Sequence, residues 1–300
     1  MVEQKKHILQ RQNALVIYNP TAGSRAKIIS PTLQSLTLVG MNLDIQETQS
    51  AGHAKTLCQE AIKNGSYDCI IAAGGDGTIN QVANNLIGTD ITLGIIPTGT
   101  ANVLASEISL SSKPELIAHT IAFGRVKPIF CGDLNGRAFL LMVSVGFDSK
   151  IVAKVSKNLK NIFGKGAYVL LALKHLFTET ATPLQVTVDG EKNIATWAIV
   201  SKGVYYAGKY KLAPEADLSR KELVVTLFEC ESVYETIRCL FSIGFGQGDS
   251  KGRAKVLRGT SVLIEGDANE PVQLDGDHVG TLPASVSVFQ EPLNLIVPTK

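Results

Sequence analysis

The segment Gly74-Gly75-Asp76-Gly77-Thr78 places three glycines around one carboxylate, directly after an apolar run. Glycines let backbone N–H groups approach an anion closely, and a helix that begins there adds the positive end of its dipole. Asp76 alone would repel phosphate, so its carboxylate predicts a divalent cation such as Mg²⁺ between the two negative groups. The alternative is an ordinary strand-to-helix turn in which Asp76 is a helix N-cap.

A second pair of carboxylates, Asp275 and Asp277, lies one residue apart across Gly276 in the segment QLDGD. A turn breaks the side-chain alternation of a strand, so both carboxylates can face the same side. One acid of such a pair can serve as a general base. The alternative is a surface Asp-Gly turn, which is our interpretation of Asp189-Gly190.

The elements around the glycine segment indicate a parallel sheet covered by helices. Short β-type runs alternate with helical patterns through the first ~125 residues, as in α/β proteins. The loops NPTAGSR, TQSAG, GGDGT and PTGTAN each follow the carboxyl end of a predicted strand, which is the edge where open α/β sheets bind ligands. The predicted strands are 14–18, 43–48, 68–73 and 92–97.

The second half of the sequence is rich in β-type patterns. Hairpins are predicted around Asn135-Gly136 and Asp189-Gly190, with further strands toward the C-terminus. We therefore expect an α/β nucleotide-binding domain over 1–126 and a β-rich, sandwich-like domain over 127–300. The extreme C-terminus is expected to pack back on the first domain, and the active site to lie in the cleft between the two.

Composition argues against several classes of protein. The chain has 300 residues, is 45% hydrophobic and carries a formal net charge of +2, which disfavours a nucleic-acid partner. Five scattered cysteines without a CxxC pair argue against a disulfide framework or a zinc site and favour a reducing compartment. Apolar runs fall short of the ~18 residues that cross a bilayer, so we expect a cytoplasmic protein. Its oligomeric state stays open, a homo-oligomer included.

Three segments in this order, NPTAGSR, GGDGTINQVANNL and LGIIPTGTANVLASE, resemble the catalytic domain of diacylglycerol kinases and of bacterial lipid kinases related to sphingosine kinase. The resemblance continues through SVGFDSKIV, YAGKYKLAPEA and LDGD, and so covers almost the whole chain. GGDGT also occurs in NAD kinases and phosphofructokinases, whereas PTGTAN after one further helix and strand is more specific.

The resemblance implies an ATP-dependent lipid kinase that transfers the γ-phosphate to a lipid hydroxyl, such as that of diacylglycerol or a sphingoid-like base. It implies Mg²⁺ bound through the nucleotide near Asp76, with the glycines serving the phosphates. Where the family usually reads LDGE, its second acid corresponds to Asp277, which we expect to be the catalytic base with Asp275 as a partner sharing metal or proton. The implied ATP contacts are Asn19, Gly23, Thr48, Gly74, Gly75, Asp76, Gly77, Thr78, Asn80, Gly99, Thr100 and Asn102.

The sequence departs from the family at three positions. Arg220 stands where the family's structural Mg²⁺ loop, which follows a Pro-x-Ala segment, has an Asp. A guanidinium cannot ligate a cation, although it can replace the charge of one, so a second metal site is doubtful. Gln81 and Val103 stand where acids are usual near the nucleotide, which removes negative charge there.

Residues 149–178 contain recurring lysines and no acidic residue, with apolar residues at helical spacings. A basic amphipathic helix of this kind can lie on an anionic bilayer, which predicts peripheral membrane association. The alternative is a helix whose apolar side is domain core and whose lysines are solvated. The lysines are Lys150, Lys154, Lys157, Lys160, Lys165 and Lys174.

Two other functions stay open. An NAD kinase would share GGDGT and a β-rich second domain, but PTGTANVLASE argues against it. A catalytically degenerate nucleotide- or lipid-binding regulator would account for Arg220, Gln81 and Val103, but Asp76 and Asp277 are intact.

Overall fold

The computed structural model describes residues 11–20, 26–50, 52–154, 181–206, 208, 210–230, 232, 234–236, 238–239 and 254–299. The chain forms two compact units. Unit 1 comprises Met1–Pro128 together with Leu293–Lys300, and unit 2 comprises Ile129–Pro292.

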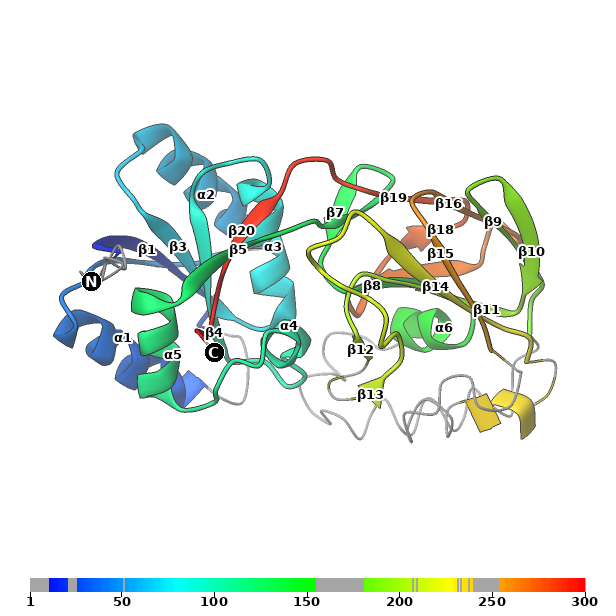
Figure 1. Ribbon diagram of the computed structural model, residues 1–300, viewed down its shortest axis with the longest axis horizontal. Helices are drawn as coiled ribbons and strands as arrows, with labels where there is room; N and C mark the ends of the chain where they lie inside the picture. Colours follow the sequence, from blue (N-terminus) through cyan, green and yellow to red (C-terminus); the bar gives the residue numbers. More distant parts are fainter. Residues whose placement is uncertain are drawn as a thin grey trace, which may run out of the picture. The chain divides into compact units, whose positions relative to one another are not determined.

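Unit 1 is built on a six-stranded sheet in the order β2-β1-β3-β4-β20-β5 (Figure 1). The pairs β1–β2, β1–β3, β3–β4 and β4–β20 are parallel, so the loops after β1 to β4 leave one edge of the sheet. The strands are β1 (Asn13–Tyr18), β2 (Asn42–Glu47), β3 (Cys69–Gly74), β4 (Thr92–Pro97), β5 (Arg125–Ile129) and β20 (Leu293–Val297).

Helices cover both faces of this sheet, which explains why its central strands are buried on both sides. Leu36 of α1 and Ile117 and Ile121 of α5 pack on Val16 and Ile71, while α2 and α3 lie on the other face (Figure 1). Gly65, with a φ of 65°, ends α2. The helices are η1 (Ala26–Ile28), α1 (Ile29–Leu38), α2 (His53–Asn64), α3 (Asp76–Leu86), α4 (Val103–Glu107) and α5 (Pro114–Phe123).

Unit 2 is a sandwich of two six-stranded sheets with a shared apolar core. One sheet has the order β10-β9-β16-β19-β6-β7 and the other β15-β14-β11-β8-β17-β18. Val186, Val262 and Val286 of the first sheet pack against Val143, Val200 and Val225 of the second.

Unit 2 also contains a helix and a short two-stranded sheet among its described residues. The first sheet contains β6 (Gly132–Leu134), β7 (Arg137–Phe139), β9 (Leu184–Val188), β10 (Glu191–Ala195), β16 (Val262–Glu265) and β19 (Ala284–Val288). The second contains β8 (Met142–Val145), β11 (Trp197–Ser201), β14 (Leu223–Phe228), β15 (Ala254–Gly259), β17 (Pro271–Leu274) and β18 (Asp277–Thr281). The remaining elements are α6 (Phe147–Lys154) and the pair β12 (Tyr205–Tyr206) and β13 (Tyr210–Lys211).

Both predicted hairpins are present, and a third has the same turn. Asn135-Gly136, Asp189-Gly190 and Asp275-Gly276 each place two consecutive residues at positive φ, as tight two-residue hairpins require. In each turn the first residue is Asn or Asp, which tolerates the left-handed region better than other side chains.

The predicted basic helix over 149–178 lies mostly outside the described residues, since α6 is described only to Lys154. We expected these lysines to face outward, but Lys150 does not. Its Nζ lies 3.1 Å from the buried Glu270 carboxylate and 2.9 Å from Thr182 Oγ1. Within the described part of the chain, no helix is long and apolar enough to cross a membrane.

Candidate active site

Backbone hydrogen bonds hold the loops of unit 1 together at one edge of its sheet. The Asn19 N–H donates to the Ala73 carbonyl at 3.1 Å, and the Thr48 N–H donates to the Tyr18 carbonyl at 2.8 Å. These bonds continue the parallel ladders one residue past the strands. The loop residues after β1, β2 and β3 therefore start next to one another at the predicted ligand-binding edge.

Asp76 joins the two glycine loops. One oxygen of its carboxylate accepts the Asn102 N–H and the other accepts the Val103 N–H, each at 3.0 Å. Asn102 and Val103 begin α4, so Asp76 caps a helix from the neighbouring loop and satisfies two of its free N–H groups. Asp76 is not the N-cap of its own helix, because Gly75 occupies that position in α3.

The glycines of these loops have two different roles. A Cβ on Gly99 would lie 2.9 Å from the Gly75 Cα and 2.8 Å from Asn102 Oδ1, and a Cβ on Gly74 would lie 2.5 Å from the Thr78 Cβ. Close packing therefore requires glycine at positions 74 and 99, and their expected contact with phosphate stays a prediction. Gly77 is exposed in the first turn of α3, where backbone N–H groups lack partners within the helix.

Alanine substitutions should separate these two roles. Gly99→Ala is expected to lower the free energy of unfolding by ~2 kcal/mol, because the added methyl group has no room. Gly77→Ala should leave stability unchanged. If the expected phosphate site lies at this helix end, the added methyl group should weaken ATP binding about tenfold, which corresponds to ~1.4 kcal/mol. Urea titration and calorimetric ATP binding measure both. Unchanged ATP affinity in Gly77→Ala would contradict a phosphate site at this helix end.

The other residues expected to contact the nucleotide differ in their exposure to solvent, and so in their accessibility to a ligand. Thr100 is exposed and Thr48 is half-buried. Asn80 is buried, and its Oδ1 accepts an N–H of Asn84 at 2.7 Å, so it supports α3 from within. Asn19 Nδ2 donates to Thr78 Oγ1 at 3.3 Å and links the first loop to the third. Gly23 lies outside the described residues.

Asn102 supplies a buried acceptor at the same edge. Its Nδ2 donates to the Gly99 carbonyl at 2.8 Å, which holds the side chain inside its own turn. Its Oδ1 has no hydrogen-bond partner among the described residues, although the side chain is only 6% exposed. A buried oxygen of this kind is suited to a donor or a cation brought by a ligand.

In unit 2, the two predicted acids have different environments. The Asp275 carboxylate accepts three backbone N–H groups, from Leu140 at 2.8 Å and from Leu141 and Met142 at 2.9 Å. Asp277 is the exposed first residue of β18 and pairs through its backbone register with Leu274. Its two oxygens thus fix the turn to Leu140, Leu141 and Met142, at the start of β8. That Asp275 shares a metal or a proton with Asp277 stays a prediction.

A chain of hydrogen bonds between buried side chains also supports this turn. The Gly276 N–H donates to Gln273 Oε1 at 2.8 Å, and Gln273 Nε2 donates to Ser144 Oγ at 2.9 Å. Ser144 Oγ in turn donates to Asp148 Oδ1 at 2.6 Å. The turn that carries Asp277 is therefore held at both Asp275 and Gly276.

Asp148 ends this chain as a buried carboxylate. It also accepts the Trp197 indole N–H and the Tyr206 hydroxyl, each at 3.0 Å. Burial raises the pKa of Asp148, while the hydrogen bonds from Ser144, Tyr206 and Trp197 act in the opposite direction. Sequence reasoning missed this role of Ser144 and Asp148. In the sequence, the signal for these roles was one polar residue, Ser144, within the apolar run LLMVSVGF, and a second, Asp148, directly after that run.

Comparison with known proteins identifies both units. Residues 13–134 match the model of the diacylglycerol kinase catalytic domain, and residues 141–297 match that of the YegS C-terminal NAD kinase beta sandwich-like domain. The chain belongs to the diacylglycerol kinase catalytic-domain family. This confirms the resemblance found in the sequence, together with its fold class of an α/β domain followed by a β sandwich-like domain.

Individual relatives agree over nearly their whole length. A protein named diacylglycerol kinase from Bacillus subtilis (strain 168) is 28% identical over 294 residues, covering 96% of this chain and 97% of the relative. Another of that name from Staphylococcus saprophyticus is 24% identical, with 96% of both chains covered. A solved structure of a diacylglycerol kinase from Bacillus anthracis str. Sterne has a TM-score of 0.77 at 24% identity, covering 96% of this chain and 97% of that one.

As a member of this family, the chain is a lipid kinase. The structure shows where two residues that depart from the family pattern lie. Gln81 is exposed on α3, whereas Val103 is buried and contributes its N–H to the Asp76 carboxylate. The contact between Asp76 and α4 is therefore made by the backbone and does not need an acid at position 103.

Proposed function

We propose that this lipid kinase transfers the γ-phosphate of ATP to the hydroxyl of diacylglycerol or a similar lipid, with Asp277 as the base. The observation that carries the proposal is the Asp76 bridge between the two glycine loops. It fixes the GGDGT and PTGTAN segments to each other and leaves the first turn of α3 exposed at Gly77. A helix N-terminus set among fixed glycine loops suits a polyphosphate.

The residues present fit a magnesium ion that arrives with the nucleotide. A carboxylate oxygen has two lone pairs and can accept an N–H group while it ligates a cation, which suits Asp76, and the buried Asn102 Oδ1 offers another oxygen nearby. Among the described residues, no cluster of three or more acidic, histidine or cysteine side chains could hold a metal alone. When bound, the ion supplies positive charge to the phosphate oxygens, and Asp76 and Asn102 would hold it.

Phosphate transfer then needs a base for the lipid hydroxyl. Asp277 is exposed on a turn held by Asp275 and Gln273, so its carboxylate can meet a substrate while its backbone stays in place. A carboxylate in this position would accept the hydroxyl proton as the oxygen attacks the γ-phosphorus. The reaction requires Asp277 of unit 2 to reach the nucleotide held by unit 1, and a lipid acceptor requires the enzyme to work at a membrane surface.

The test is transfer of labelled γ-phosphate from ATP with Mg²⁺ in mixed micelles. The panel of acceptors contains diacylglycerol, monoacylglycerol, ceramide, a long-chain base and, because unit 2 is NAD kinase-like, NAD. We expect label in a lipid, with diacylglycerol first because relatives bear that name. Label in NAD alone would replace the proposal with an NAD kinase. ATP binding without any labelled product would replace it with a regulator that does not catalyse transfer.

A further inference from the structure

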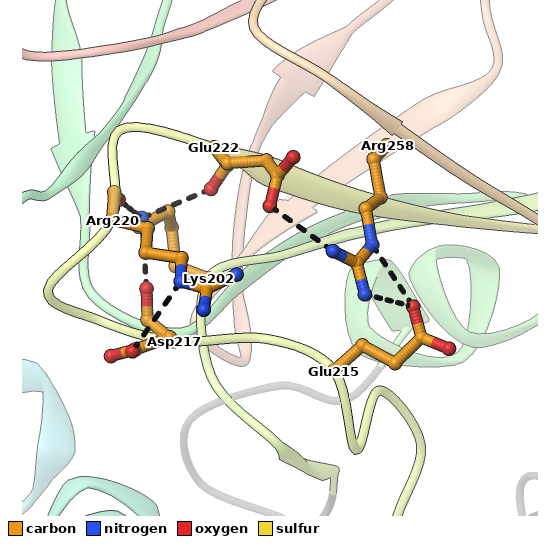
Figure 2. A network of polar contacts seen from close by, with 6 residues as sticks. All are labelled: Lys202, Glu215, Asp217, Arg220, Glu222 and Arg258. Atoms are coloured by element: carbon orange, nitrogen blue, oxygen red, sulfur yellow. Dashed lines mark hydrogen bonds and ion pairs between the residues drawn. The ribbon is translucent and has the colours of Figure 1, made fainter.

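Lys202 is a lysine whose side chain is fully buried in unit 2. It follows β11 directly and is 0% exposed. Its Nζ donates to the backbone carbonyls of Arg220 and of Glu222, the latter at 3.0 Å, and lies 3.5 Å from the carbonyl of Asp217 (Figure 2). Three carbonyl oxygens from one six-residue segment, 217–222, thus converge on one ammonium group. We call this segment the carbonyl loop.

The ammonium form of Lys202 matches this setting. An ammonium group has three N–H donors and no acceptor, and here it meets three carbonyl acceptors. Burial lowers the pKa of Lys202 to about 8, while the charges of Asp217 and Glu222 act in the opposite direction. At neutral pH the side chain is therefore mostly charged.

The side chains of the carbonyl loop point to other partners. The Arg220 guanidinium is largely exposed and lies 3.8 Å from the Asp217 carboxylate (Figure 2). Arg258 makes two hydrogen bonds to Glu215, at 2.7 and 3.0 Å, and its guanidinium lies 3.8 Å from the Glu222 carboxylate. The sequence suggested that the Arg220 guanidinium could replace a metal charge. In the structure, the Arg220 backbone carbonyl accepts a hydrogen bond from the Lys202 ammonium group, whereas the Arg220 guanidinium lies near the Asp217 carboxylate.

These residues do not fit the structural metal ion that the family pattern implies for this segment. The acidic ligand position holds Arg220, and the inward-facing carbonyls already accept hydrogen bonds from Lys202. The geometry points to Lys202 as a built-in cation. We propose that its ammonium group holds the carbonyl loop in place of a structural metal, so that this enzyme needs a divalent metal only with its nucleotide.

The same lysine connects the carbonyl loop to the turn that carries Asp277. The Lys202 backbone N–H donates to the Leu141 carbonyl at 2.7 Å, and the Leu141 N–H donates to the Asp275 carboxylate at 2.9 Å. A loop that loses its central cation is therefore expected to disturb the segment that fixes Asp275. The inference itself does not depend on the proposed reaction, because stability and proteolysis test it without substrate.

The first test compares thermal stability with and without a chelator. Lys202→Met keeps most of the side-chain volume and removes all three donors, so we expect the Tm to fall by ~10 °C, as several buried carbonyls lose their partners. Excess EDTA should shift the parent Tm by no more than ~1 °C. The matched control is Lys221→Met, since Lys221 is an exposed lysine of the same loop. Its Tm should stay within ~2 °C of the parent.

Two outcomes of this first test would overturn the inference. In one, EDTA lowers the parent Tm as much as Lys202→Met does, which would mean that a metal ion holds the loop. In the other, Lys202→Met is as stable as Lys221→Met, which would mean that the ammonium group contributes nothing.

The second test reads the loop itself by trypsin cleavage after Arg220 and Lys221. Lys202→Met and Lys202→Ala should be cut there about tenfold faster than the parent, because the loop opens more often. In Lys202→Ala, n-propylammonium should slow cleavage, since it returns the missing donors, while tetramethylammonium at equal ionic strength should not. Val286→Ala creates a cavity in the core at the other sheet of unit 2 and lowers overall stability without touching the carbonyl loop, so it serves as the control. Parent-like cleavage in Lys202→Met, or equal effects of the two salts, would overturn the inference.

Discussion

Replacing Asp277 with asparagine should abolish phosphate transfer to lipid while ATP affinity stays within about twofold of the parent. Asparagine has the same shape but cannot accept the hydroxyl proton, and loss of a general base costs ~10²–10⁴-fold in kcat. The backbone should not move, because Asp275 and Gln273 hold the turn from other positions. Labelled phosphate transfer gives kcat, and calorimetry with a non-hydrolysable ATP analogue gives the affinity.

Two further variants sharpen this experiment. Asp277→Glu restores the acid that the family usually has at this position, so activity should be retained within about tenfold. Asp267→Asn removes another exposed carboxylate of unit 2 and should leave transfer unchanged. Substantial transfer by Asp277→Asn would exclude this residue as the base.

Replacing Asp275 with asparagine should lower both stability and activity, for a different reason. Its carboxylate accepts three backbone N–H groups, and an asparagine NH₂ group would face one of these donors instead of accepting it. We expect a loss of ~3 kcal/mol, which corresponds to a fall in Tm of ~10 °C for a unit of this size. We also expect kcat to fall ~10²-fold, because a turn displaced by ~1 Å misplaces the Asp277 carboxylate.

The Asp189-Gly190 turn provides a matched control for Asp275. Asp189 also stands at positive φ before a glycine, and its carboxylate accepts the N–H groups of Thr260 and Ser261 at 2.8–3.1 Å. Asp189→Asn should lower stability and leave kcat unchanged, because no proposed catalytic residue follows that turn. If both variants lose activity in proportion to stability, Asp275 is a structural residue only and does not position Asp277.

The sequence was sufficient to locate the loops but not the contacts between them. Strands β1 to β4 begin and end within one residue of their predicted bounds, because buried runs flanked by Gly, Asn and Pro are local signals. The hydrogen bonds from Asp76 to Asn102 and Val103 cross 26 and 27 residues. Local spacing carries no trace of them, so the sequence could assign Asp76 only a cation or its own helix cap.

The same limit applies to residues whose partners lie far away in the sequence. Asp275 and Asp277 look alike in the sequence, and only the N–H groups of residues 140–142 separate a fixed acceptor from an exposed acid. Lys202 was passed over because a lone lysine is normally solvated, whereas here its partners are carbonyls 15 to 20 residues away. Arg220 drew attention by its side chain, but its carbonyl makes the contact with Lys202.

The position of β20 affects the order in which this enzyme can be completed during synthesis. Leu295 pairs with Leu93 of β4, and β20 separates β4 from β5 although it is the last strand of the chain. While the ribosome is still making unit 2, the nascent unit 1 has every glycine loop but lacks the strand between β4 and β5. Unit 1 cannot close its sheet until residues 293–297 emerge. A chain truncated just before β20 should therefore leave the sheet of unit 1 open between β4 and β5, although all of its glycine loops have already been made.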